Sequence, residues 1–139
     1  MISRIKQGLT CLFLRFDIKN EVVAKQLLSK YEFELFKNMS DYDKVHSFNV
    51  YLKTLQDPVL KNDINFKKLA LLHDCGKGKV TIFRRVKKVL IGDKELEKHP
   101  EKAFEKLKEI NLQLAILCKR HHEKSEDEKM ISFQRLDDE

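Results

Sequence analysis

The chain has 139 residues, of which 42% are hydrophobic and 36% charged, with a formal net charge of +6 and only 4 Gly and 2 Pro. This length suits one domain, and the composition is typical of a compact helical protein with few tight hairpin turns. No run approaches the ~18 apolar residues that a membrane span requires, so we expect no membrane partner. The basic charge favours an anionic partner without choosing one.

The cysteines indicate a reducing environment. Cys11, Cys75 and Cys118 are odd in number, widely spaced and without a C-x-x-C pair. This pattern argues against a disulfide framework and a zinc ribbon, and it favours a cytoplasmic protein. Cys75 and Cys118 lie in apolar stretches, which favours buried small hydrophobes over nucleophiles.

The first half of the chain has helical patterns. The run 9–16 is interpreted as a buried N-terminal segment, and Asn20 as the N-cap of a helix with apolar residues at 22, 23, 27 and 28. A short helix is expected over 32–37. Ser40, with Asp43 three residues later, predicts a capped helix to about Leu55. Its expected apolar stripe is Val45, Phe48, Leu52 and Leu55.

The next elements centre on a strongly apolar helix, FKKLALLHD, over 66–74. It follows a loop over 57–65 and ends at Cys75-Gly76, where glycine suits a helix C-terminus. Residues 78–92 mix apolar and basic side chains, and a helix is the favoured interpretation.

The last part of the chain also predicts helices. His99-Pro100 begins one, with Pro in the first turn, and its apolar face is Ala103, Phe104, Leu107 and Ile110. Another helix is expected over 112–122. Ser125 with Glu128 predicts a capping box for the final helix, whose apolar residues are Met130, Ile131, Phe133 and Leu136. No strand is predicted, so the expected fold class is all-α, a compact single-domain helical bundle.

All five histidines fall on predicted helices or at their ends, at positions 46, 73, 99, 121 and 122. Taken singly, each is more often a structural or surface residue than a ligand, but together they can converge. Adjacent residues on a regular helix point about 100° apart, so His73 and Asp74 can face one ligand only where the helix ends. Imidazole with carboxylate suits Fe, Mn, Co, Ni or Zn.

The stretch LALLHDCGKG resembles the H-D-x-G-K signature of the HD-domain superfamily of metal-dependent phosphohydrolases. The resemblance covers roughly residues 32–139. DKVHSFNV is similar to the segment with the first metal histidine, HPE and HHE to those of the two-metal subgroup, and QRLDDE to that of the last aspartate. In that last segment Asp137 is in register, with Asp138 the near alternative.

The resemblance implies a bundle of five or more helices around a central metal site, with residues 1–31 as a helical extension of a core over 32–139. It implies a first metal held by His46, His73, Asp74 and Asp137. Asp74 would bridge to a second metal held by His99 and His121, with His122 as a further ligand or a substrate contact. Two divalent transition-metal ions are expected, Fe or Mn first, with Co, Ni, Zn or Mg as alternatives.

The activity that the resemblance implies is hydrolysis of a phosphate mono- or diester, nucleotide-like, by a metal-bound hydroxide. Asp74 and Lys77 are the candidate catalytic residues, and Lys77 would also receive the phosphate; its other interpretation is a solvated residue after a helix end. The chain reads HHEKSEDEKM where the cyclic-di-GMP phosphodiesterase branch has a G-Y-P loop. It therefore resembles a small stand-alone HDIG-type protein, and that dinucleotide is not assigned as its substrate.

The run FRRVKK over 83–88 is the densest basic patch. It is either the solvated face of an amphipathic helix or a surface that attracts an anionic substrate. Arg84 and Arg85 are accordingly candidate substrate-binding residues, with Lys77 and His122. The alternative function is a non-catalytic metal-binding module that binds nucleic acid or a protein partner. The expected partner of the chain is a small phosphorylated, nucleotide-like substrate, and nucleic acid is not favoured.

Overall fold

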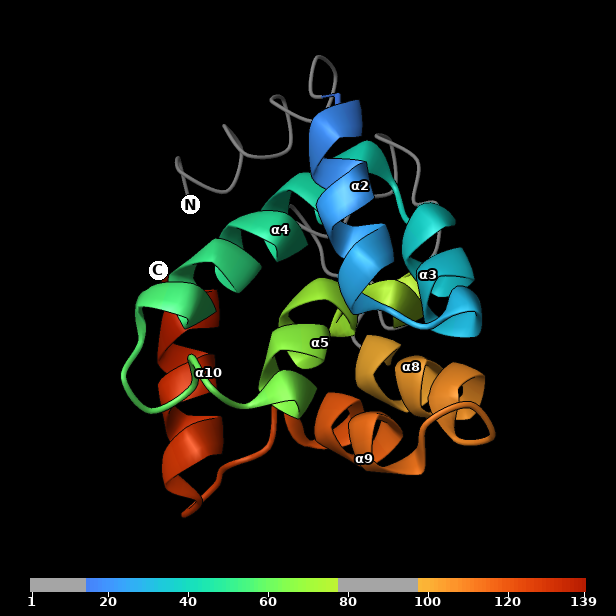
Figure 1. Ribbon diagram of the computed structural model, residues 1–139. Helices are drawn as coiled ribbons and strands as arrows, with labels where there is room; N and C mark the ends of the chain where they lie inside the picture. The colour runs from blue at the N-terminus through green and yellow to red at the C-terminus, as the bar shows by residue number, and fades with distance from the viewer. Residues whose placement is uncertain (1–14, 78–97) are drawn as a thin grey trace, which may run out of the picture.

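A computed structural model describes residues 15–77 and 98–139 of the chain. Over these ranges the structure is helical and contains no strand (Figure 1). The elements are α2 (Ile18–Leu27), α3 (Lys30–Lys37), α4 (Asp41–Gln56), α5 (Ile64–Leu72), the 3-10 turn η1 (Cys75–Lys77), α8 (His99–Leu107), α9 (Leu112–Arg120) and α10 (Glu128–Asp138). The all-α prediction is confirmed.

Helix α5 lies in the middle of the bundle, in contact with α3, α4, α9 and α10 (Figure 1). Its sequence explains this position. Phe66 and the four consecutive residues 69–72 are all buried, and a helix that is apolar on every side is stable only when other elements surround it. The end of α5 therefore lies inside the protein, and the residues that follow it begin in the interior.

The helix starts are set by side-chain caps that the sequence predicted only in part. Ser40 accepts from the backbone N–H of Asp43, as expected. Asp17, not Asn20, caps α2. The predicted box of Ser125 with Glu128 is wrong, because Asp127 is the N-cap of α10 and Ser125 accepts from its N–H. Several Asp, Ser and Asn residues precede each apolar run, and each can cap a helix.

The buried face of α4 differs from the predicted stripe. Leu52 is 46% exposed and lines a surface groove beside Leu136, whereas Ser47, Val50 and Thr54 are buried. Helix α4 packs on α5, and the small side chains among its buried residues differ from the leucine-rich stripe that its sequence suggests. For α10, Ile131 is likewise 48% exposed, although Phe133 is fully buried.

Helix α3 is joined to the rest of the bundle by the carboxylate of Glu32. Glu32 completes a capping box with Ser29, and its two oxygens accept from Lys68 of α5 at 2.8 Å and from Asn111 at 2.9 Å. Ala24 of α2 also lies in the hydrophobic core. The predicted boundary at residue 31 stays a prediction, but α2 and α3, the helices described before α4, pack on the same core.

No described helix has the length and apolar character that crossing a bilayer demands. The helix expected over 78–92 lies outside the described residues, as do the first residues of the run 9–16.

Cys75 and Cys118 are buried as predicted, and burial raises the pKa of Cys75 to about 12. A thiol with such a pKa is a poor nucleophile at neutral pH.

Gly76 lies at the closest approach between η1 and α8. A Cβ at this position would lie 2.0 Å from the carbonyl oxygen of His99 and 2.7 Å from the backbone nitrogen of Ala103. The glycine was expected to end a helix, but α5 already ends at Leu72 and His73 is its C-cap. Gly76 is needed because two stretches of backbone touch, a packing role that its position after the helix does not indicate.

We predict that Gly76→Ala destabilises the protein by about 1–3 kcal/mol, since neither backbone segment can move without shifting α8. Urea unfolding of the metal-free protein measures this change. Glu105→Ala, on the exposed side of α8, is the control, because its ion pair with Lys108 lies in solvent. Equal stability of the two variants would contradict the packing argument.

Candidate metal centre

Five different elements bring the predicted ligands to one place. His46 lies within α4, His73 is the C-cap of α5, and Asp74 follows in the turn before η1. His99 is the first residue of α8, and His121 is the C-cap of α9. The remaining two are His122, after α9, and Asp137 in the last turn of α10. Most of these positions are helix ends, where side chains can point along the axis toward a shared interior site.

The first group consists of His46, His73 and Asp137, whose ligand atoms all lie within 4.8 Å of one another. Oδ1 of Asp137 lies 2.8 Å from Nε2 of His46 and 3.1 Å from Nε2 of His73. The two imidazole rings are edge to face, with centroids 5.5 Å apart. Two nitrogens and one oxygen thus face a common point from three helices.

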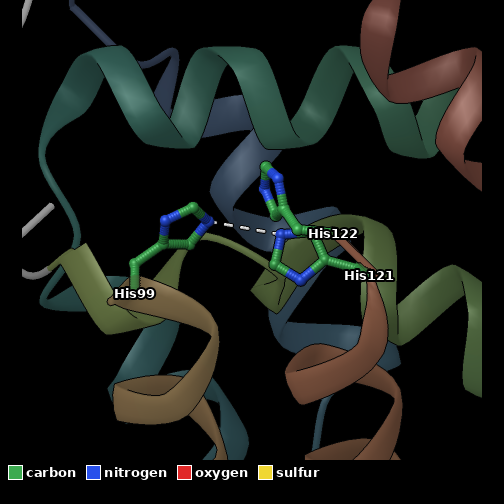
Figure 2. A group of neighbouring side chains, drawn as sticks. All are labelled: His99, His121 and His122. Atoms are coloured by element: carbon green, nitrogen blue, oxygen red, sulfur yellow. Dashed lines mark hydrogen bonds between the residues drawn. The ribbon is translucent and has the colours of Figure 1, made fainter. Parts of the chain in front are cut away.

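The second group consists of His99, His121 and His122, and Figure 2 shows their rings turned toward one another. Nε2 of His99 lies 3.3 Å from Nε2 of His121. The ring of His122 lies 4.9 Å from that of His99 and 4.2 Å from that of His121, centroid to centroid. His122 is exposed, whereas the other two histidines are buried.

Asp74 lies between the two groups. Its Oδ1 is 3.1 Å from Nε2 of His99, and its Oδ2 is 3.5 Å from Nε2 of His73. The carboxylate is buried, and each oxygen faces a different group of histidines. This is the arrangement in which one carboxylate can serve two cations at once.

Backbone carbonyls fix two of the rings with their Nε2 atoms toward the centre. Nδ1 of His73 donates to the carbonyl of Ala70 at 2.8 Å, and Nδ1 of His121 donates to that of Cys118. In a neutral imidazole this leaves the lone pair on Nε2. Metal-ligating histidines typically have such a partner on the other nitrogen, because it sets both tautomer and orientation.

The Nε2 atom of His73 provides a test of fit. It is buried and lies near two carboxylates, but it makes no well-directed hydrogen bond. A buried polar atom without such a bond costs about 1–3 kcal/mol, so one that persists calls for an explanation. A cation between His46, His73 and Asp137 would give this atom a partner, and the mixed nitrogen and oxygen donors suit a divalent transition metal.

The buried histidine and aspartates of the centre shift one another's pKa values. Burial alone would lower the pKa of His73, but the carboxylates of Asp74 and Asp137 raise it to about 9. Burial would raise the pKa of Asp137, but His73 and His46 hold it well below its usual value. Burial would likewise raise the pKa of Asp74, but His73, Lys77 and His99 hold it well below its usual value. The carboxylates of Asp74 and Asp137 thus favour the protonated form of His73 at pH 7.

The second group has the opposite behaviour. Burial, followed by the charges of His73 and His122, lowers the pKa of His121 to about 3. Burial and the nearby His99 also lower the pKa of His122. Both rings are therefore neutral at pH 7, which is the form in which imidazole binds a metal.

Of the other predicted site residues, one borders the centre, one lies away from it and two are outside the described residues. Nζ of Lys77 lies 3.5 Å from Oδ2 of Asp74, and its side chain is 21% exposed, so it borders the centre. Asp138 is exposed and belongs to neither group, unlike Asp137. Arg84 and Arg85 lie outside the described residues.

Two supporting residues were not expected from the sequence. The ring of Phe133 packs against His73, with centroids 5.4 Å apart, and against His121 at 6.5 Å. Nζ of Lys106 donates to the carbonyl of Cys75, beside Asp74, at 3.0 Å. Phe133 was placed only in an apolar stripe, and Lys106 has no distinguishing pattern among 28 basic residues.

We predict that the metal-free protein loses stability between pH 6.5 and 9. The pKa of His73 is about 9 in the folded state against 6.5 for the ordinary side chain, so its contribution is complete below pH 6.5 and is lost as pH rises through 9. The shift corresponds to about 3 kcal/mol. Thermal melts after chelation measure it, and Asp137→Asn should flatten the profile by removing one raising charge. A wild-type profile that is already flat would contradict the prediction.

The HD domain family matches residues 45–138, most of the chain and all of the residues in both groups. No curated protein and no solved structure matches the chain. The match agrees with the all-helical fold of the described residues. HD domains are a superfamily of metal-dependent hydrolases that bind divalent metals. The chain belongs to the HD-domain family.

Proposed function

We propose that this protein is a phosphohydrolase that cleaves a phosphate mono- or diester, with a nucleotide-like compound as substrate and two divalent transition-metal ions, Fe or Mn first, as cofactors. The proposal rests on the position of Asp74, whose two oxygens face two separate groups of histidines. Family membership supports a metal-dependent hydrolase. That the bond cleaved is a phosphate ester and that the substrate is nucleotide-like are parts of our proposal.

The ligand assignment follows the two groups. His46, His73 and Asp137 would hold one ion, and His99, His121 and His122 the other, with Asp74 shared. His122 was left open as a ligand or a substrate contact, and its place in the second group favours the ligand. Asp137 is favoured over Asp138 because only Asp137 faces the histidines.

A divalent ion at this centre supplies Lewis acidity, which activates water and neutralises charge on a phosphoryl oxygen. The protein's own contribution is to hold its ligands in the neutral or ionised form that such an ion requires. His121 and His122 are neutral, and Asp74 and Asp137 are ionised. His73, whose pKa is raised to about 9, must release its proton to bind an ion, so we expect metal affinity to rise with pH up to about 9.

Lys77 is the proposed contact for the phosphate. Its ammonium lies beside Asp74, at the edge of the centre, and is partly exposed. A cation in this position can balance Asp74 when the substrate is absent and receive an anionic oxygen when it is bound. The ring of His122, in the second group, is exposed as well.

Metal counts of aspartate and histidine variants test the ligand assignment. We expect two ions per chain in the wild type and in Asp138→Ala, one in His99→Ala and in Asp137→Ala, and none bound tightly in Asp74→Ala. The neighbouring aspartates are matched controls, because one faces the histidines and the other lies in solvent. Elemental analysis and calorimetric titration with Mn²⁺ provide the counts. Equal retention by Asp137→Ala and Asp138→Ala would reject the first site.

Activity separates the proposed enzyme from a binding module. On a panel of nucleotide mono- and diesters we expect turnover by the metal-loaded wild type, and its loss in His73→Ala and Asp74→Ala. Lys77→Gln should keep its metal and lose roughly 100-fold in kcat, as expected when one group that stabilises developing charge is removed. Lys61→Gln, an exposed lysine outside the centre, is the control.

The opposite outcome is equally informative. Full metal loading without turnover on any phosphate ester, together with RNA or protein binding that survives chelation, would support the non-catalytic module. In that case Lys77→Gln would change neither metal content nor binding.

A further inference from the structure

A side chain on α10 holds the segment that carries the second group of histidines. Nε2 of Gln134 donates to the carbonyl of His121 at 3.1 Å and to the carbonyl of Glu123 at 2.7 Å. These carbonyls belong to the residues directly before and after His122. Both hydrogens of one amide nitrogen are thereby used on the same short stretch of backbone.

This stretch needs such a partner because it follows the last turn of α9. The final carbonyls of a helix have no partner within it. Besides the amide of Gln134, a turn bond from the N–H of Glu123 to the carbonyl of Arg120 holds the segment. His122 has no helical backbone of its own to fix the direction of its ring, and it is exposed.

Gln134 also lies close in the sequence to a ligand of the first group. It precedes Asp137 by three residues on α10, a spacing that puts both side chains on neighbouring positions of one helix face. The residue before Gln134 is Phe133, whose ring packs against the rings of His73 and His121. One helix turn thus contacts both groups of ligands, by an apolar ring and by an amide.

We infer that Gln134 is a positioning residue for the second metal: its amide fixes the backbone on both sides of His122, and so holds His121 and His122 at a set distance from Asp137. The inference rests on the proposed function, because it takes the three histidines as metal ligands. Gln134 belongs to neither group of candidate ligands. It acts on the ligands through their carbonyls.

The decisive variant is Gln134→Met, which keeps an unbranched side chain of similar length and removes both donors. Loss of a partner that orients metal ligands typically reduces metal affinity about 10-fold to 100-fold. We expect a loss of this size in Mn²⁺ affinity at the second site alone, measured by calorimetric titration, with the first site unchanged. In a His99→Ala background, where the second site is already disabled, the same substitution should have no effect on the remaining ion.

Gln113→Met is the matched control. Gln113 is a second interhelical glutamine, whose Oε1 accepts from Asn65 at 3.3 Å on the exposed side of α9. It should leave both metal affinities unchanged. Hydrogen exchange of the metal-free protein gives an independent readout, since the amide of Glu123 should exchange faster in Gln134→Met than in the control.

The outcomes distinguish this inference from the proposed function. If the wild type binds fewer than two ions, the proposed second site fails, and this inference fails with it. If the wild type binds two ions and Gln134→Met binds both with unchanged affinity, only the positioning role is rejected. Equal weakening of both sites would also overturn it, because that result indicates a general effect on α10.

Discussion

The buried carboxylate of Asp74 is the constraint around which this protein is arranged. A carboxylate that is 3% exposed must be matched by positive or hydrogen-bonding groups, and His73, Lys77 and His99 provide them from different elements. To bring them together, the apolar helix α5 must end inside the protein and the start of α8 must touch the turn that follows. Gly76 allows that approach, and Lys106 holds the turn by a carbonyl. The core and the site are therefore parts of one arrangement.

Much of this arrangement could be predicted from residue order. The apolar run before His73 and the proline after His99 are local signals, and each depends on a few neighbouring residues. The ligands that the structure brings together are those that the resemblance implied. The distinction between Asp137 and Asp138 needed the rotation of α10, which two adjacent identical residues cannot reveal.

What could not be predicted depends on contacts between elements. The buried stripe of α4 contains Ser47 and Thr54, whereas Leu52 is 46% exposed. A hydrophobic pattern reports only the apolar residues of one helix, not the shape of its neighbour. Gln134 is a similar case. Its role is defined by two carbonyls more than ten residues away, and no spacing rule connects them.

The contact between His73 and Asp137 also bears on the order in which the protein is assembled. In a zinc finger the metal supplies the folding energy, so the chain remains unfolded until the ion binds. Here a protonated imidazole between two carboxylates neutralises part of the interior charge, and an extensive apolar core surrounds it. The folded chain therefore holds its candidate ligands together with part of their charge already balanced. An ion bound at the proposed centre would meet a site that the fold has assembled, whereas in a zinc finger the ion itself assembles the site.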